Sequence, residues 1–209
     1  MVTLSAAYGT AGGLIGPLVA ERLGVPFIDR AIPVRVANDL GVSIEHAMSR
    51  DDQVKGWLQR LLSSAAPMSS DYMIGYDAPR VALLPDAEFV ACTESAIRAT
   101  VKQRGGVILG RAGALVLRDH PTALHVRLDA HPERRVKQAV AELGIGEAEA
   151  REAMRQNDNA RTAYVRHYYR ADATDSTLYH LLLDSTRLPF EACVDLIVAA
   201  AKVKGPSIG

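Results

Sequence analysis

The chain has 209 residues, of which 48% are hydrophobic, and its 24 basic and 24 acidic residues give a formal net charge of zero. This length is enough to bury a sizeable core, and the neutral charge argues against a protein that coats nucleic acid polymers. No apolar run reaches the roughly 18 residues of a membrane-spanning helix, so we expect no membrane partner. The start of the chain lacks the charged region of a signal peptide, and only Cys92 and Cys193 occur, so we expect a cytoplasmic protein.

The first predicted unit is a short apolar strand over residues 2–6, a glycine-rich turn over residues 8–13 and an amphipathic helix over residues 14–23. This order aims backbone N–H groups and a helix N-terminus at a phosphate. A P-loop also carries a Lys followed by Ser or Thr, for the outer phosphates and Mg²⁺, but these slots hold Gly12, Gly13 or Leu14. The turn is therefore predicted to bind phosphate through its backbone, with a tight turn without ligand as the alternative.

Four more apolar runs alternate with helical patterns along the chain. They cover residues 25–28, 105–110, 123–128 and 179–184. Five strands that are each followed by a helical stretch predict an α/β fold, with a five-stranded parallel sheet and helices on both faces. In such sheets ligands bind at the carboxyl ends of the strands, so the residues just after each strand are the first candidates for a site.

Two segments fit the sheet poorly. Residues 31–85 hold helical patterns that are broken by glycine and proline, which predicts a helical insertion. Residues 146–175 begin as a helix over residues 147–154 and continue as a polar segment, with five arginines and two acidic residues between positions 151 and 170. We therefore expect a single domain over residues 1–209, whose core is formed by residues 1–30, 86–145 and 176–205.

Several motifs, taken in order, resemble the cytidylate kinase-like family, a relative of the P-loop nucleoside monophosphate kinases. The residues that carry the resemblance are the opening loop at 5–16, Leu-Gly-Val-Pro-Phe-Ile-Asp at 23–29, the Gly-Arg turn at 107–111, Asp-Asn-Ala-Arg at 158–161 and Leu-Asp-Ser-Thr-Arg-Leu at 183–188. They cover nearly the whole chain. The resemblance implies that residues 31–85 form an acceptor-binding insertion and that residues 146–175 form an Arg-rich lid.

The resemblance also implies a set of site residues. Those expected to bind nucleotide or phosphate are Gly9, Thr10, Ala11, Gly12, Gly13, Asp29, Arg35 and Asp158. Those expected to act in catalysis, by neutralising phosphate charge, are Arg111, Arg135, Arg161 and Arg166.

Each expected role has a simpler alternative. Arg111 follows a strand and is expected to point into the ligand crevice, but an Arg there also serves as a structural ion pair. Arg35 is suited to grip an acceptor phosphate or to pair with Asp39 on a helix surface. Asp29 is placed to orient an Arg or a metal-bound water, or to cap a helix. The Arg-rich segment closes over phosphates as a lid or is a solvated basic helix.

The expected partners are ATP as donor and a nucleoside monophosphate as acceptor, with CMP or dCMP favoured by the resemblance. We expect Mg²⁺ to arrive with ATP, and the scattered His and Cys residues predict no protein-bound metal. Whether the chain forms a homo-oligomer is left open by the sequence. Two other functions also remain open at this point: a nucleotide- or phosphate-binding module without turnover, and a kinase for another small acceptor.

Overall fold

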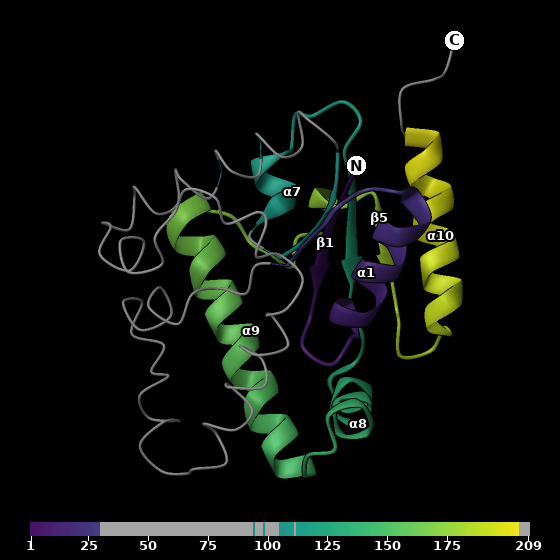
Figure 1. Cartoon of the computed structure of the whole chain (residues 1–209). Helices are drawn as coiled ribbons and strands as arrows, with labels where there is room; N and C mark the ends of the chain where they lie inside the picture. Colours follow the sequence, from purple (N-terminus) through teal and green to yellow (C-terminus); the bar gives the residue numbers. More distant parts are fainter. Residues whose placement is uncertain (30–93, 95–97, 99–104, 111, 205–209) are drawn as a thin grey trace, which may run out of the picture. The chain divides into compact units, whose positions relative to one another are not determined.

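The computed structural model describes residues 1–29, 94, 98, 105–110 and 112–204 (Figure 1). These residues belong to one compact unit that is formed by Met1–Ile32 and Glu94–Gly209. The predictions for residues 31–85, for Arg35 and for Arg111 lie outside the described residues, and so does the prediction for the side chain of Asp29.

The centre of the described unit is a parallel five-stranded sheet, as the sequence predicts. The strands lie in the order β2-β3-β1-β4-β5. The central strand β1 pairs with β3 and β4, so that Val2 lies opposite Val107 and Leu124. Such a strand is covered on both faces, which explains its nearly continuous apolar sequence. The bounds are β1 Val2–Ala6, β2 Phe27–Asp29, β3 Val107–Leu109, β4 Leu124–Leu128 and β5 Leu181–Leu183.

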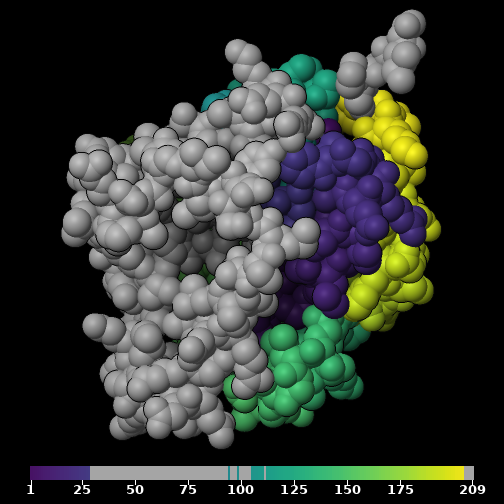
Figure 2. Space-filling model, viewed as in Figure 1, coloured from purple at the N-terminus to yellow at the C-terminus, as the bar shows by residue number. Residues whose placement is uncertain are grey.

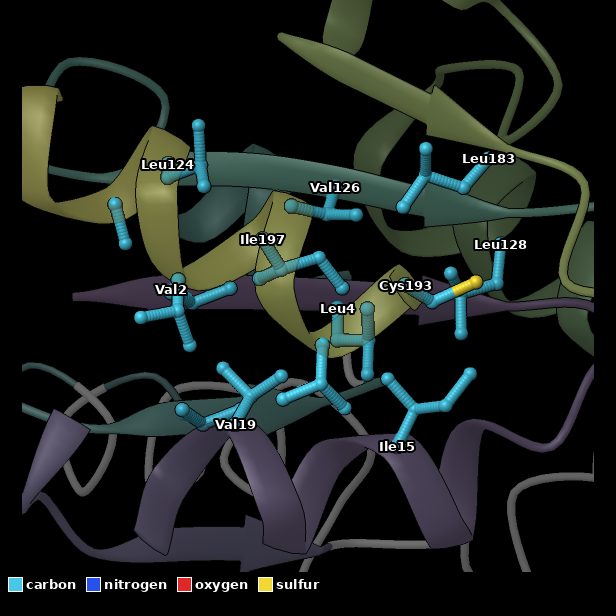
Figure 3. Close-up of a cluster of buried hydrophobic side chains, with 14 of the residues drawn as sticks. Val2, Leu4, Ile15, Val19, Leu124, Val126, Leu128, Leu183, Cys193 and Ile197 are labelled. Atoms are coloured by element: carbon cyan, nitrogen blue, oxygen red, sulfur yellow. The ribbon is translucent and has the colours of Figure 1, made fainter. Parts of the chain in front are cut away.

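One face of the sheet is covered by α1 (Gly12–Leu23) and α10 (Phe190–Lys204), which pack against each other. In Figure 2 the two helices, purple and yellow, lie side by side. Arg22 of α1 forms ion pairs with Glu191 and Asp195 of α10 across the outer side of this contact. Beneath them the largest apolar cluster joins every second residue of β1 and β4 to both helices (Figure 3), with the labelled members Val2, Leu4, Ile15, Val19, Leu124, Val126, Leu128, Leu183, Cys193 and Ile197.

The other face holds a smaller cluster of Ile108, Val116, Leu117 and Ala123, against which Tyr169 packs. Val116 ends the short helix α7 (Gly113–Val116), and Tyr169 ends α9 (Glu147–Tyr169). Helices therefore lie on both faces of the sheet, as predicted. The remaining elements are α8 (Pro132–Leu143) and a 3₁₀ turn over Ser176–Leu178.

The extent of α9 differs from the prediction, which ended its helix at residue 154. The helix continues without a break to Tyr169 and ends at Arg170, whose φ of 50° is left-handed. Its buried positions, Ala150, Ala153, Tyr164 and Val165, are small or widely spaced, so the polar residues between them hide the helical pattern. Arg155 and Glu152 form an ion pair at the i,i+3 spacing on the exposed side.

None of the helices in the described ranges combines the length and the apolar composition that a membrane span needs.

Candidate phosphate site

The glycine-rich loop between β1 and α1 is shaped by close packing. Gly9 has a φ of 72°, and a Cβ on it would lie 2.2 Å from the carbonyl oxygen of Arg135. A Cβ on Gly12 would lie 2.3 Å from the Cβ of Ala6. Ala11, the N-cap of α1, is also left-handed, with a φ of 54°. The loop therefore keeps two glycines where other residues cannot fit and holds one alanine in a conformation that costs about 1–2 kcal/mol.

This conformation leaves a row of N–H groups available. Within the described residues, the N–H groups of Ala11, Gly12 and Gly13 donate to no backbone acceptor. The groups of Gly12 and Gly13 belong to the first turn of α1, where a helix has no internal partners for its donors. Successive N–H groups next to a left-handed residue form a concave anion-binding nest, and the dipole of α1 adds positive potential. These N–H groups make the loop a candidate anion site, and phosphate binding there stays a prediction.

Thr10 serves the loop itself. Its side chain is fully buried, and its hydroxyl donates to the carbonyl oxygen of Ala7 at 2.7 Å. Its N–H donates to the same oxygen at 3.2 Å. The hydroxyl that the sequence offered as a phosphate ligand is thus engaged inside the turn.

Arg135 of α8 connects the loop to α9. Its Nε donates to the carbonyl oxygen of Tyr8 at 2.7 Å, and one terminal nitrogen donates to both carboxylate oxygens of Asp158 at 2.7 Å. Only 6% of Arg135 is exposed, so water solvates its charge poorly. The ion pair with Asp158 compensates for this loss of solvation. The structure thus brings together Arg135, expected to act in catalysis, and Asp158, expected to bind nucleotide or phosphate.

Arg161 lies one helical turn beyond Asp158 on the same helix. One terminal nitrogen lies 3.4 Å from the hydroxyl oxygen of Ser5, near the carboxyl end of β1. Arg161 forms no ion pair with a carboxylate of the described residues, although the charge of Asp158 acts on it. Burial lowers the pKa of Arg161, and the neighbouring charge of Arg127 lowers it further. Among the residues that the structure describes, Arg161 is therefore a partly buried cation without an ion-paired carboxylate, and it lies next to Ser5 at the end of β1.

Arg127 is a member of this cluster that the sequence analysis missed. It lies on β4, is 6% exposed, and donates two hydrogen bonds to Asp129 at 3.0 and 2.6 Å. A third donor bonds the carbonyl oxygen of Ala173 at 2.7 Å, and the guanidinium carbon lies 5.7 Å from the centre of the Tyr179 ring. A charged residue inside a strand of a covered parallel sheet was the available signal, because buried charges need partners.

The residues after β5 hold the loop from another side. The Ser185 hydroxyl donates to the carbonyl oxygen of Thr10 at 2.8 Å. Next to it, Arg134 bonds Asp184 at 2.6 Å and Thr186 at 3.1 Å. Arg134, the neighbour of Arg135 in the sequence, is thus engaged in an ion pair with Asp184.

Arg166 lies on a more exposed part of α9. It lines a pocket of about 500 Å³ together with Thr162, Arg170, Ala171 and Asp172. Its contact with a phosphate at the loop stays a prediction.

The described residues contain no group of three or more His, Cys, Asp or Glu side chains that could hold a metal ion. The loop also lacks the Ser or Thr that binds Mg²⁺ in P-loops, because Gly13 and Leu14 stand there.

A central parallel strand, a glycine-rich loop and a helix that begins from this loop define a P-loop kinase-like fold. The model of the cytidylate kinase-like family matches residues 1–187, and the chain belongs to this family.

Two solved structures are similar in overall fold. An uncharacterized protein from Eubacterium ventriosum aligns over 97% of both chains with a TM-score of 0.66 and 17% identity. Shikimate kinase from Bacteroides thetaiotaomicron aligns over 96% of this chain and 97% of its own, with a TM-score of 0.47 and 15% identity. The first likeness supports the fold, and the second is too low to add to it.

Among curated proteins, a uronate isomerase of Corynebacterium glutamicum is 32% identical over 102 residues. The match covers 49% of this chain and 20% of that relative, so the chain spans about a fifth of the length of the curated relative it matches.

Proposed function

We propose that this protein transfers a phosphoryl group from ATP to a nucleoside monophosphate, with CMP or dCMP as the acceptor. Membership of a kinase-like family supports a phosphotransferase. Because the reaction passes through a transition state that spreads negative charge over the transferred group, positioned cations and N–H donors carry most of the catalysis.

The observation that carries the proposal is the charge balance around Arg161. Three guanidinium groups come together near the carboxyl ends of β1 and β4, and two of them, Arg127 and Arg135, are ion-paired with Asp129 and Asp158. Arg161 has no such pair among the described residues. A half-buried guanidinium in this state is stabilised by an anion, and its planar fork suits two phosphate oxygens.

In the proposed reaction the loop N–H groups hold the phosphates of the donor. Arg161 neutralises charge on the transferred group, and Arg166, on the same helix, is expected to assist when the acceptor is bound. The hydrogen bond from Arg135 to the carbonyl oxygen of Tyr8 supports a place for Arg135 beside the donor phosphates, which the family resemblance implies. The roles of Arg35 and Arg111 at the acceptor phosphate rest on the family resemblance, and Asp29 is expected to orient an Arg or a metal-bound water. Mg²⁺ would enter bound to ATP and retain waters as ligands, and no step is assigned to it here.

A second function, binding of a nucleotide without turnover, is favoured by one observation. The loop lacks both the Lys and the Ser or Thr of a P-loop, and a Cβ on Gly13 would meet no described atom within 4 Å. Losing one positioned cation typically costs several kcal/mol of transition-state stabilisation. Backbone N–H groups alone are enough to bind an anion but give little catalysis.

One experiment separates the two functions. The protein is incubated with ATP, Mg²⁺ and each nucleoside monophosphate in turn, and ADP is measured alongside the melting temperature with each nucleotide. The proposal predicts ADP formation that depends on an acceptor and is fastest with CMP or dCMP. Nucleotide-induced stabilisation without ADP would contradict the enzyme and support the binding module. Fastest turnover with a small acceptor of another class would support the third possibility, a different kinase.

A further inference from the structure

Three carbonyl groups in and just before the glycine loop accept hydrogen bonds from side chains. Ala7 accepts from Thr10, Tyr8 accepts from Arg135, and Thr10 accepts from Ser185. The carbonyl of Ala11 accepts from the N–H groups of Leu14 and Ile15, which begins the helical pattern of α1. No other hydroxyl or guanidinium of the described residues bonds these carbonyls. The orientation of the loop is therefore set in part by side chains from distant elements.

Ser185 occupies a special place among these contacts. It follows β5, is 1% exposed, and its hydroxyl reaches across 175 positions of the chain to the carbonyl oxygen of Thr10 at 2.8 Å. This carbonyl belongs to the same peptide unit as the N–H of Ala11. In a planar trans peptide the C=O and N–H bonds point in opposite directions. Fixing the Thr10 carbonyl toward Ser185 thus fixes the Ala11 N–H away from it.

The Ala11 N–H is one of the cradle donors without a backbone acceptor in the part of the chain that the structure describes. Ala11 also has a left-handed backbone, with a φ of 54°. This conformation is unfavourable for alanine and persists only where surrounding contacts fix it. Without the Ser185 bond this peptide unit could turn over, which would present the carbonyl oxygen to a bound phosphate in place of the N–H. A carbonyl dipole facing an anion is repulsive.

We infer that Ser185 is a positioning residue that holds the Ala11 N–H toward the phosphate of a bound nucleotide. This inference rests on the proposed binding of phosphate at the loop. Ser185 is assigned no contact with the ligand, because it is buried and its hydroxyl proton is donated to the carbonyl oxygen of Thr10. Arg135 acts in the same way on the carbonyl of Tyr8, two residues earlier, and so fixes the Gly9 N–H away from Arg135.

The test uses Ser185→Ala in the full-length protein, with Ser176→Ala as the matched control because Ser176 is exposed in the 3₁₀ turn. We expect the KM for ATP to rise about tenfold in S185A, with kcat changed less than about twofold, and the control to stay unchanged. Ser185→Thr, which keeps a hydroxyl, is expected to restore most of the affinity. Inorganic phosphate should move the amide proton resonance of Ala11 downfield in the wild type and not in S185A.

Failure of the positioning role of Ser185 and failure of phosphate binding at the loop would give different results. A folded S185A that binds ATP as tightly as S176A, with the same Ala11 shift, would overturn the positioning role and leave the proposed function intact. A wild-type protein that binds neither ATP nor phosphate would overturn both. If S185A does not fold, Ser185→Cys keeps the volume with a weaker donor, and the same loss of ATP affinity is expected.

Discussion

Gly13 is one of the positions where a P-loop kinase would carry a cation, and no described residue fills the place of its side chain. A Cβ there would meet no described atom within 4 Å, and Gly13 has no positive φ. We predict that Gly13→Arg tightens ATP binding by roughly five- to tenfold, because a guanidinium adds charged hydrogen bonds to the phosphates. Isothermal titration measures this, with Gly13→Gln as an uncharged control. Equal affinities of both variants and the wild type would argue against phosphates at this loop.

At Gly9, unlike Gly13, we predict that adding a side chain is harmful. Gly9 and Gly144 have nearly the same φ, 72° and 66°, but a Cβ meets the Arg135 carbonyl at 2.2 Å in the first case and nothing within 4 Å in the second. Gly144→Ala should therefore cost about 1 kcal/mol of backbone strain, and Gly9→Ala roughly 2 kcal/mol or more beyond that. Urea unfolding measures both. Equal losses would mean that the loop does not pack on α8 as described.

At the scale of elements, Asp158 of α9 forms an ion pair with Arg135 of α8. Arg135 in turn donates a hydrogen bond to the loop, so this pair links α9 to the loop. Removing Asp158 leaves the buried Arg135 guanidinium without its counterion. Asp158 is partly exposed, so we expect Asp158→Ala to lower the free energy of unfolding by about 1–3 kcal/mol. Glu152→Ala removes an exposed partner of Arg155 on the same helix and should cost less than about 0.5 kcal/mol. Denaturant titration of the pair checks this, and equal costs would rule out a special role for the Arg135 contact.

The elements that could be predicted from sequence are those with a strong local pattern. All five strands are short apolar runs between glycines or polar residues, and each was predicted at its place. The second half of α9 was missed because its buried positions, such as Tyr164 and Val165, are separated by polar residues that resemble a loop. Their burial depends on contacts with distant elements, which no local pattern records.

The candidate site was only partly predictable for the same reason. The loop glycines, Asp158 and Arg161 follow recognisable motifs. The pairing of Arg135 with Asp158 depends on how α8 meets α9, and a lone Ser185 carries no signal before β5 is placed beside the loop. Arg127 was missed because it lies within an apolar run that predicts a buried strand and gives no sign of a binding residue.

For the molecule as a whole, His125 makes stability depend on pH. It is buried on β4, accepts or donates to Thr3 at 2.8 Å, and stacks on His180, whose ring lies 3.1 Å from the Lys204 amine. Burial, followed by the charges of His180 and Lys204, lowers the pKa of His125 to about 4. The unfolded chain, with a pKa near 6.5, therefore binds more protons between these values.

The sign follows from this difference. Stability from neutral His125 is fully present above pH 6.5 and is lost as the pH falls toward 4, by about 2 kcal/mol at pH 5. The lowered pKa of His180 acts in the same direction. Urea unfolding at pH 7.5 and pH 5.0 should show the loss in the wild type and a smaller one in His125→Gln. Identical pH dependence of the two proteins would contradict this assignment.

The central claim is that Arg161 on α9 supplies charge that the loop lacks. The most direct measurement is ADP formation from ATP and CMP by Arg161→Ala, compared with Arg155→Ala, whose arginine is exposed and paired with Glu152. We predict that R161A lowers kcat/KM at least about tenfold while R155A changes it less than about twofold. Equal activity of R161A and R155A, with both proteins folded, would contradict the account.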